Sequence, residues 1–154
     1  MSYAQFIGHE NPPFKAEISA RRIAEFAESI GETNPIYFDE EAARKAGYPG
    51  IPAPLTFPFA LTMDAQQSYQ TLGAMGVDRI RVVHGEQGFA YVRPMVAGDV
   101  ITGRQRVVDI YDKKGGALTF LVTDTAMTDA ADKPVCNLRS VIVIRNIDQG
   151  GEPS

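Results

Sequence analysis

The sequence predicts an α+β fold, in which one antiparallel sheet of about five strands wraps around a central α-helix. An apolar helical pattern begins at Thr56, and four strand-like segments follow Asp78, separated by short breaks rich in glycine, proline and aspartate. Short breaks favour antiparallel neighbours. The chain has 154 residues, 44% of them apolar, which suffices for one core. We therefore expect residues 1–154 to form a single domain.

The first elements are a short strand over 14–18 and a helix that Ser19 caps. The buried face of this helix should consist of Ile23, Phe26, Ala27 and Ile30, which recur at helical spacing. Gly31 supplies its C-terminal stop. A shorter helix should follow with Asp39 as its N-cap, because acidic residues lie in its first turn and basic residues in its last.

The central helix should start at Thr56, its predicted N-cap, with Pro58 in the first turn. It should run past Gln67 and be mostly buried, since its pattern is apolar. Prolines at 52 and 54 keep the preceding backbone extended. A shaped loop thus leads into a helix N-terminus, which could hold a thioester carbonyl or an oxyanion.

The remaining strands are predicted near 80–93, 100–111, 117–128 and 135–145. The last one is apolar on both faces: Cys136, Leu138, Ile142 and Ile144 share one face, and Val141 and Val143 the other. One face should cover the helix and the other a partner, so we expect the chain to associate. Residues 147–154 should be a loose tail.

The formal charge of −4 and the pI near 5.1 argue against a general nucleic-acid or membrane binder, because both partners require a positive surface. The single cysteine, Cys136, excludes an internal disulfide, and its apolar surroundings favour a structural thiol. No segment reaches the length of a membrane span. These features predict a cytoplasmic protein.

Four separated motifs resemble the MaoC-like dehydratase family, and more narrowly its FAS1-like branch, the N-terminal type of MaoC domain. They are Gly-Glu-Thr-Asn-Pro-Ile-Tyr at 31–37, Ala-Gly-Tyr-Pro-Gly-Ile-Pro-Ala-Pro-Leu-Thr-Phe at 46–57, His-Gly-Glu-Gln-Gly-Phe-Ala-Tyr-Val-Arg-Pro at 84–94 and Ala-Gly-Asp at 97–99. The resemblance covers about residues 5 to 146. It implies the hot-dog fold, which agrees with the predicted sheet around one helix.

The resemblance also implies chemistry. Members that carry it out have Asp-x-Asn-Pro-x-His, whose Asp and His act as an acid/base pair in an (R)-specific enoyl-thioester hydratase or 3-hydroxyacyl-thioester dehydratase. Here Asn34 is kept, but Glu32 and Tyr37 stand at the Asp and His positions. Tyrosine has a reference pKa of about 10 and is a poor base at neutral pH. The candidate catalytic positions are therefore Glu32, Asn34 and Tyr37, in an incomplete pair.

FAS1-like domains are implied to pair with a second hot-dog domain that keeps the Asp and His. This chain would then shape the acyl tunnel of a homodimer or a heterodimer in fatty-acid metabolism, with the substrate on coenzyme A or acyl carrier protein and no cofactor. The predicted substrate-binding residues are Tyr48, Pro54, Thr56, Phe57, His84 and Arg93. Arg93 is the preferred phosphate contact among the arginines of the strand region.

Four alternatives remain open. Glu32 and Asn34 can form a capped turn without chemistry, and His84 can be structural or a replacement base. The chain can be a non-enzymatic acyl-binding or assembly subunit. It can also be a hot-dog thioesterase in which Asp64 attacks or activates water. No metal is expected, because His9 and His84 are the only histidines and neither has a carboxylate at ligand spacing.

Overall fold

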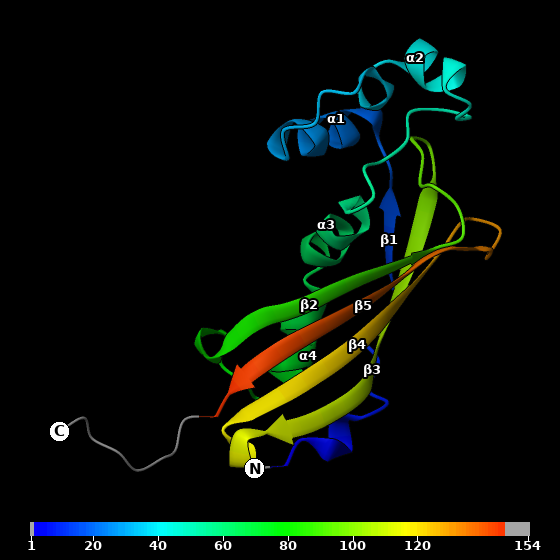
Figure 1. The fold of residues 1–154 in the computed structure, drawn as a ribbon. Helices are drawn as coiled ribbons and strands as arrows, with labels where there is room; N and C mark the ends of the chain where they lie inside the picture. Colours follow the sequence, from blue (N-terminus) through cyan, green and yellow to red (C-terminus); the bar gives the residue numbers. More distant parts are fainter. Residues whose placement is uncertain (1, 147–154) are drawn as a thin grey trace.

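A five-stranded antiparallel sheet forms the body of the molecule in the computed structural model, which describes residues 2–146 (Figure 1). Its strands are β1 (Phe14–Glu17), β2 (Val82–Tyr91), β3 (Val100–Lys113), β4 (Leu118–Thr128) and β5 (Pro134–Arg145). The predicted strand positions are confirmed. The sheet curls around helices α3 (Phe57–Asp64) and α4 (Gln67–Ala74), as the hot-dog fold requires. The predicted tail, 147–154, lies outside the described residues.

The strand order is β1-β3-β4-β5-β2, so one expected neighbour relation is wrong. Strand β2 pairs with β5 and not with β3, which follows it in the chain. The connecting residues 92–99 cross one end of the sheet, anchored by buried Met95, whose carbonyl accepts from the Ala53 amide at 2.8 Å. Eight residues can span about 26 Å, whereas three strand spacings require only about 14 Å. The break between β2 and β3 is short in sequence, but its eight residues are long enough to cross the sheet.

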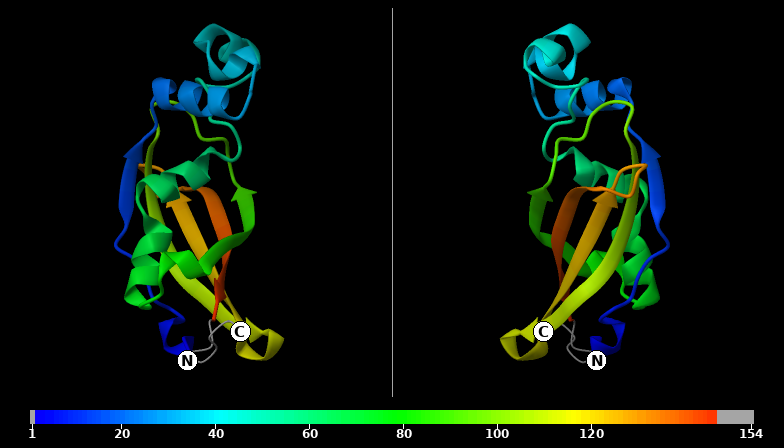
Figure 2. Two further views of the ribbon diagram at one scale, coloured as in Figure 1. Left: turned by 90° about the vertical axis from the view of Figure 1, so that its left-hand side faces the viewer. Right: turned by 90° about the vertical axis from the view of Figure 1, so that its right-hand side faces the viewer.

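The predicted central helix is two helices. Gln66 has a left-handed conformation, with φ of 53°, and separates α3 from α4. The helices change direction at this break (Figure 2). The side chain of Gln67 is buried, and the Asn11 amide donates to its backbone carbonyl at 2.8 Å. Asn11 also donates to Thr71, at 3.0 Å, so the break brings polar residues of α4 into a buried hydrogen-bond network.

The two N-terminal helices form as predicted, with one exception. Helix α1 (Ala20–Ser29) is capped by Ser19, whose hydroxyl accepts from the Arg22 amide at 3.0 Å. Helix α2 (Glu40–Lys45) is capped by Asp39, which accepts from the Glu41 amide at 3.0 Å. The expected burial of Ile30 is wrong: α1 ends at Ser29, and Ile30 is 51% exposed because its backbone has left the helix.

Four short 3-10 helices complete the described chain: η1 (Ala4–Phe6), η2 (Pro35–Tyr37), η3 (Arg79–Arg81) and η4 (Lys114–Gly116). The core has two apolar clusters. One packs α1 and α3 against the sheet around Phe57 and Leu138, and the other packs α4 around Leu72 and Leu121. Across residues 2–146, we find no helix with the length and apolar character needed to cross a membrane.

Candidate functional site

The candidate site is built on the segment between α1 and α3, at the end of the sheet where α1 and α2 lie (Figure 1). Gly31, with φ of 74°, ends α1 and turns the chain. The next residue, Glu32, folds its carboxylate back onto the backbone, where one oxygen accepts from the amides of Thr33 at 3.1 Å and Asn34 at 3.3 Å. The carboxylate is therefore committed to shaping this turn.

Asn34 and Pro35 form the second half of the turn. The Asn34 side-chain oxygen accepts from the Ile36 amide at 3.2 Å, so Asn34 caps η2, and Pro35 occupies the first helical position. The capped turn that the sequence offered as one reading of Glu32 and Asn34 is thus present. It holds Glu32 and Tyr37 at its two ends.

Tyr37 is half-buried and packs against the apolar cluster around Phe57. Its burial, and next the nearby Glu32 and Tyr48, raise the pKa of the phenol above its normal value. The phenol is therefore protonated at neutral pH. It can donate a hydrogen bond, but it cannot serve as a general base. The structure brings Glu32, Asn34, Tyr37 and Tyr48 together, but this group contains no histidine, the side chain that usually acts as a general base near neutral pH.

The start of α3 is held between the sheet and α1. Phe57 is fully buried and makes an edge-to-face contact with Phe26 of α1, with ring centroids 5.4 Å apart. Pro54 is buried beside it. Thr56 occupies the N-cap position, but the predicted cap bond is wrong: its backbone has helical φ and ψ, and its hydroxyl accepts no amide of the helix. The exposed Thr56 side chain is consequently free to face a ligand.

Tyr91 was missed by the sequence analysis. Its hydroxyl donates to the carbonyl of Leu55 at 2.6 Å, tying the end of β2 to the residue just before Thr56. Burial, and then the neighbouring Cys136, raise the pKa of this phenol. Burial also raises the pKa of the Cys136 thiol to about 11, which suits a structural thiol and not a nucleophile. The available signals were the alternation of Phe89 and Tyr91 on the inner face and the place of Tyr91 in the motif at 84–94.

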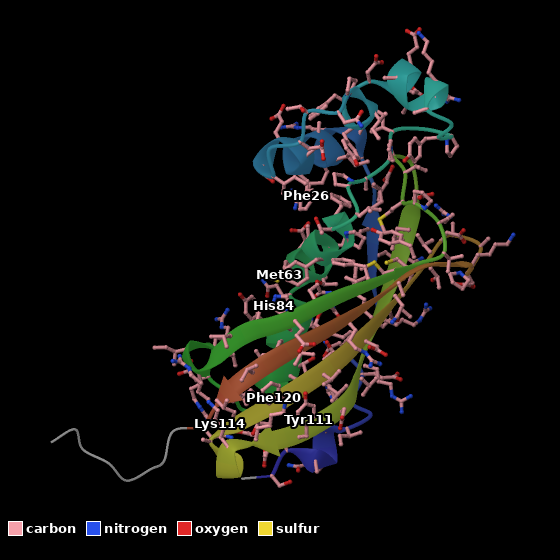
Figure 3. All side chains as sticks on the ribbon, viewed as in Figure 1. Phe26, Met63, His84, Tyr111, Lys114 and Phe120 are labelled. Atoms are coloured by element: carbon pink, nitrogen blue, oxygen red, sulfur yellow. The ribbon has the colours of Figure 1, made fainter. Side chains whose placement is uncertain are left out.

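His84 lies on β2 and stacks on Phe59 of α3, with ring centroids 5.1 Å apart and planes within 3° (Figure 3). A β-bulge at Gly85 brings both His84 and Gln87 to the inner side of the sheet. Met63, one helical turn after Phe59 on α3, is 41% exposed; Figure 3 labels both Met63 and His84. The imidazole therefore belongs to an exposed margin between α3 and the edge strand. Its role stays a prediction.

Arg93 and Asp64 both have ionic partners. The Arg93 guanidinium binds Asp99 at 2.8 Å and Asp129 at 3.3 Å, and the hydrogen bond to Asp99 is the main reason its pKa is raised. A phosphate would have to share this guanidinium with two carboxylates. Asp64 is exposed and pairs with Arg22 of α1 at 3.2 Å. Residues 2–146 contain no cluster of three side chains suited to hold a metal ion.

The model of the FAS1-like dehydratase domain region matches residues 5–138 of the chain. A UPF0336 protein of Saccharopolyspora erythraea is 40% identical over 148 residues, which cover 96% of this chain and 94% of that relative.

Two solved structures share the fold at 24% identity each. The C-terminally truncated HadBC (3R-hydroxyacyl-ACP dehydratase) complex of Mycobacterium tuberculosis has a TM-score of 0.77 and matches 90% of this chain and 96% of that one. A MaoC-like dehydratase has a TM-score of 0.81 and matches 93% of this chain but 43% of its own. The second chain is thus more than twice the length of the shared domain.

Proposed function

Because the chain belongs to the FAS1-like dehydratase domain family, we propose that it is a subunit of an (R)-specific enoyl-thioester hydratase or 3-hydroxyacyl-thioester dehydratase. In this proposal it shapes the acyl-binding tunnel, and a MaoC-like partner supplies the acid/base pair. The substrate is carried on coenzyme A or on acyl carrier protein, with no further cofactor.

The main observation in support of this proposal is the incomplete acid/base pair. Hydration of an enoyl thioester requires a group that removes a proton from water and a group that returns one to the substrate. The Glu32 carboxylate accepts two backbone amides, and the Tyr37 phenol has a raised pKa. A protonated tyrosine and an engaged carboxylate can bind and orient a substrate. They are poorly suited to move its proton at neutral pH.

The retained framework supports a role in binding. The Asn34 cap keeps the turn in place although the histidine is replaced by Tyr37. The Tyr91 hydrogen bond fixes the approach to α3, and the positive end of the helix dipole there favours the developing negative charge of a thioester oxygen. The Phe57 and Phe59 amides already donate to the carbonyls of Pro54 and Thr56, so the exposed Thr56 hydroxyl is the proposed donor to that oxygen. Tyr48 is the proposed wall, buried Pro54 and Phe57 would support the site from within the core, and Arg93 is the proposed contact for a carrier phosphate.

Strand β2 is the proposed meeting point with the partner. It lies at the edge of the sheet and is 10 residues long. An edge strand of this length offers unpaired backbone groups that a strand of another chain can extend. The margin formed by Phe59, Met63 and His84 lies beside it and would be covered. The fold is also found in the HadBC complex, which contains two kinds of subunit by name.

A non-enzymatic acyl-binding or assembly subunit is the second candidate. The same observation favours it, because a chain without a working base can keep a pocket and lose the reaction. The two proposals differ in whether activity returns when the pair is restored.

The test measures hydration of crotonyl-coenzyme A by the purified chain, through loss of the enoyl-thioester absorbance. The unmodified chain should show no rate above background. The variant Glu32→Asp/Tyr37→His restores the Asp and His of the acid/base pair on the retained turn. General acid/base groups typically raise the reaction rate by roughly 10²- to 10⁴-fold, so this variant should gain measurable activity. The matched control, Glu32→Asp/Phe38→His, introduces the same side chains with the imidazole one residue out of place, and it should stay inactive.

Addition of a hot-dog protein with an intact Asp-x-Asn-Pro-x-His motif should raise the rate further, since it supplies its own pair. Fast hydration by the unmodified chain alone, lost in Tyr37→Phe, would overturn the proposal. It would make Tyr37 the working acid or base.

A further inference from the structure

The outer face of the sheet, opposite α3 and α4, carries an apolar row across four strands. The strand register aligns Tyr111 with Phe120, Phe120 with Val143, and Val143 with Val83. The rings of Tyr111 and Phe120 stack at 5.1 Å, within 8° of parallel (Figure 3). We call these four residues the aromatic row. Tyr111 is 37% exposed and Val83 is 49% exposed, so the row is open to solvent.

The rows on either side carry opposite charges. Toward the ends of β3 and β5, the register aligns Lys113, Leu118 and Arg145, here called the basic row. On the other side it aligns Asp109, Val122, Val141 and Glu86, here called the acidic row. All four charged residues are exposed. The row on one side of the aromatic row is therefore positive and the row on the other side is negative; beyond the acidic row, the register aligns Arg106, Asp124 and Arg139.

Two β-bulges create this arrangement. The bulge at Val108 shifts the alternation of β3, so that Asp109, Tyr111 and Lys113 point outward after Val107 has pointed inward. The bulge at Gly85 turns Glu86 outward in the same way. A Cβ at Gly85 would lie 3.0 Å from a Val143 methyl group, so glycine suits this close approach.

The acidic row forms a depression of about 400 Å³. Its floor is Val122 and Val141, which are only 7% and 6% exposed although they face outward. Its rim includes Glu86 and Asp109, and neither carboxylate has an ion pair among residues 2–146. Arg139, also on the rim, is held by Asp124 at 2.8 Å. The depression thus offers an apolar floor beneath a negative rim.

We propose that the outer face binds a second copy of this chain, with the two-fold axis running along the aromatic row. Rotation about this axis lays the basic row of each copy over the acidic row of the other. Leu118 of one copy then fills the depression above Val122 of the other. Lys113 meets Asp109, and Arg145 comes beside Glu86. All of these contacts occur twice, since the interface is isologous.

The charge pattern argues for a second copy in place of an unrelated protein. A foreign partner would require only one complementary surface, whereas the two rows that flank the aromatic row are complementary to each other in charge. The ammonium of Lys113 lies 4.8 Å from the Phe120 ring centroid and 5.5 Å from that of Tyr111, so it is held close to the proposed axis. This inference is independent of the proposed function, which uses the edge of β2.

Charge reversal tests the register of the contact by sedimentation equilibrium. In a homodimer of the Asp109→Lys variant, the introduced side chain faces Lys113 of the other copy at both symmetric positions. In a homodimer of Lys113→Glu, the introduced carboxylate faces Asp109 of the other copy, so like charges again lie together. Like-charge contacts repeated at two positions should weaken self-association by about tenfold or more. An equimolar mixture of the two variants should associate as tightly as the unmodified chain, because every facing pair is then opposite in charge.

Two control variants change the same charges elsewhere. Glu28→Lys on α1 and Lys133→Glu between β4 and β5 lie on other exposed surfaces and should leave the association constant unchanged. Leu118→Asp should abolish the contact by removing the side chain that fills the depression, whereas Ile30→Asp, an equally drastic change at an exposed residue just after α1, should not.

Thermal unfolding checks that each variant is folded, and the mixture can recover only if both chains fold. If the chain also associates through β2, the variants should lose one association step and keep the other. The proposal is overturned if the single reversals associate like the unmodified chain, or if the mixture associates no more tightly than each variant alone.

Discussion

The hydroxyl of Tyr91 donates a 2.6 Å hydrogen bond to the carbonyl of Leu55, and this contact joins the edge strand β2 to the entrance of α3. The two residues are far apart in the chain, and each belongs to a motif that the sequence analysis treated separately. The bond makes those motifs one structural unit. It also leads to a first prediction.

Tyr91→Phe should lower the free energy of unfolding by about 1 kcal/mol, because it removes the hydrogen bond that ties β2 to the exposed Leu55 carbonyl. Urea unfolding measures the change. Tyr69→Phe is the control, since Tyr69 is exposed and should tolerate the loss of its hydroxyl. Equal stability of Tyr91→Phe and the unmodified chain would mean that the bond contributes nothing to the fold.

Asn34→Ala should cost about 1 kcal/mol of stability, since the side-chain oxygen that caps η2 is lost. Asn34→Asp keeps an acceptor in the same position and should recover most of that stability. Thr33→Ala, one residue earlier and exposed, should have little effect. The comparison uses urea midpoints of all three variants, and a neutral Asn34→Ala would show that Glu32 and Pro35 suffice to hold the turn.

Stability should fall at alkaline pH because the pKa values of Tyr37 and Tyr91 are raised above the normal 10.0. The unfolded chain then releases these protons at a lower pH than the folded chain does. The stabilising contribution is complete below about pH 10 and is lost as the pH rises through the raised values.

Urea unfolding from pH 8 to 11 should show this loss, and Tyr37→Phe/Tyr91→Phe should have the shallower slope. Tyr69→Phe/Tyr111→Phe, in exposed tyrosines, should keep the slope of the unmodified chain. The slopes are compared, since the first double variant starts from a lower stability. Identical slopes in all three chains would contradict the assigned cause.

The chain should release no thiol from acyl-coenzyme A. Asp64 is exposed and paired with Arg22, and it does not lie in an apolar environment that would make its carboxylate a strong nucleophile. A thiol-reactive dye measures the release, and Asp64→Asn should match the unmodified chain. Hydrolysis that Asp64→Asn abolishes would restore the thioesterase alternative.

Local signals in the sequence predicted the elements well. Ser19 and Asp39 cap the helices at the expected positions, because a cap depends on side chains within three residues of the helix start. The Asn34 turn was predictable for the same reason. The sites of the strands followed from alternation and from the glycine-rich breaks between them.

Non-local features could not be predicted in this way. The order of β2 and β5 depends on the crossing at 92–99, and the pattern of either strand alone does not encode its neighbour. The break at Gln66 depends on partners such as Asn11, more than fifty residues away in the chain. The Tyr91 bond and the two bulges have the same origin, since each is decided by what the opposite element presents.

The pairing of β2 with β5 affects the time course of folding. Strands β3, β4 and β5 follow one another through short turns, so they can pair through contacts that are close in sequence. Strand β2 can pair with β5 only after residues 92–133 and then β5 itself have been synthesised. During that interval both of its backbone edges are open. We therefore expect β2 to join the sheet last on the ribosome, and its amides to be the first of the long strands to exchange with deuterium in the finished protein.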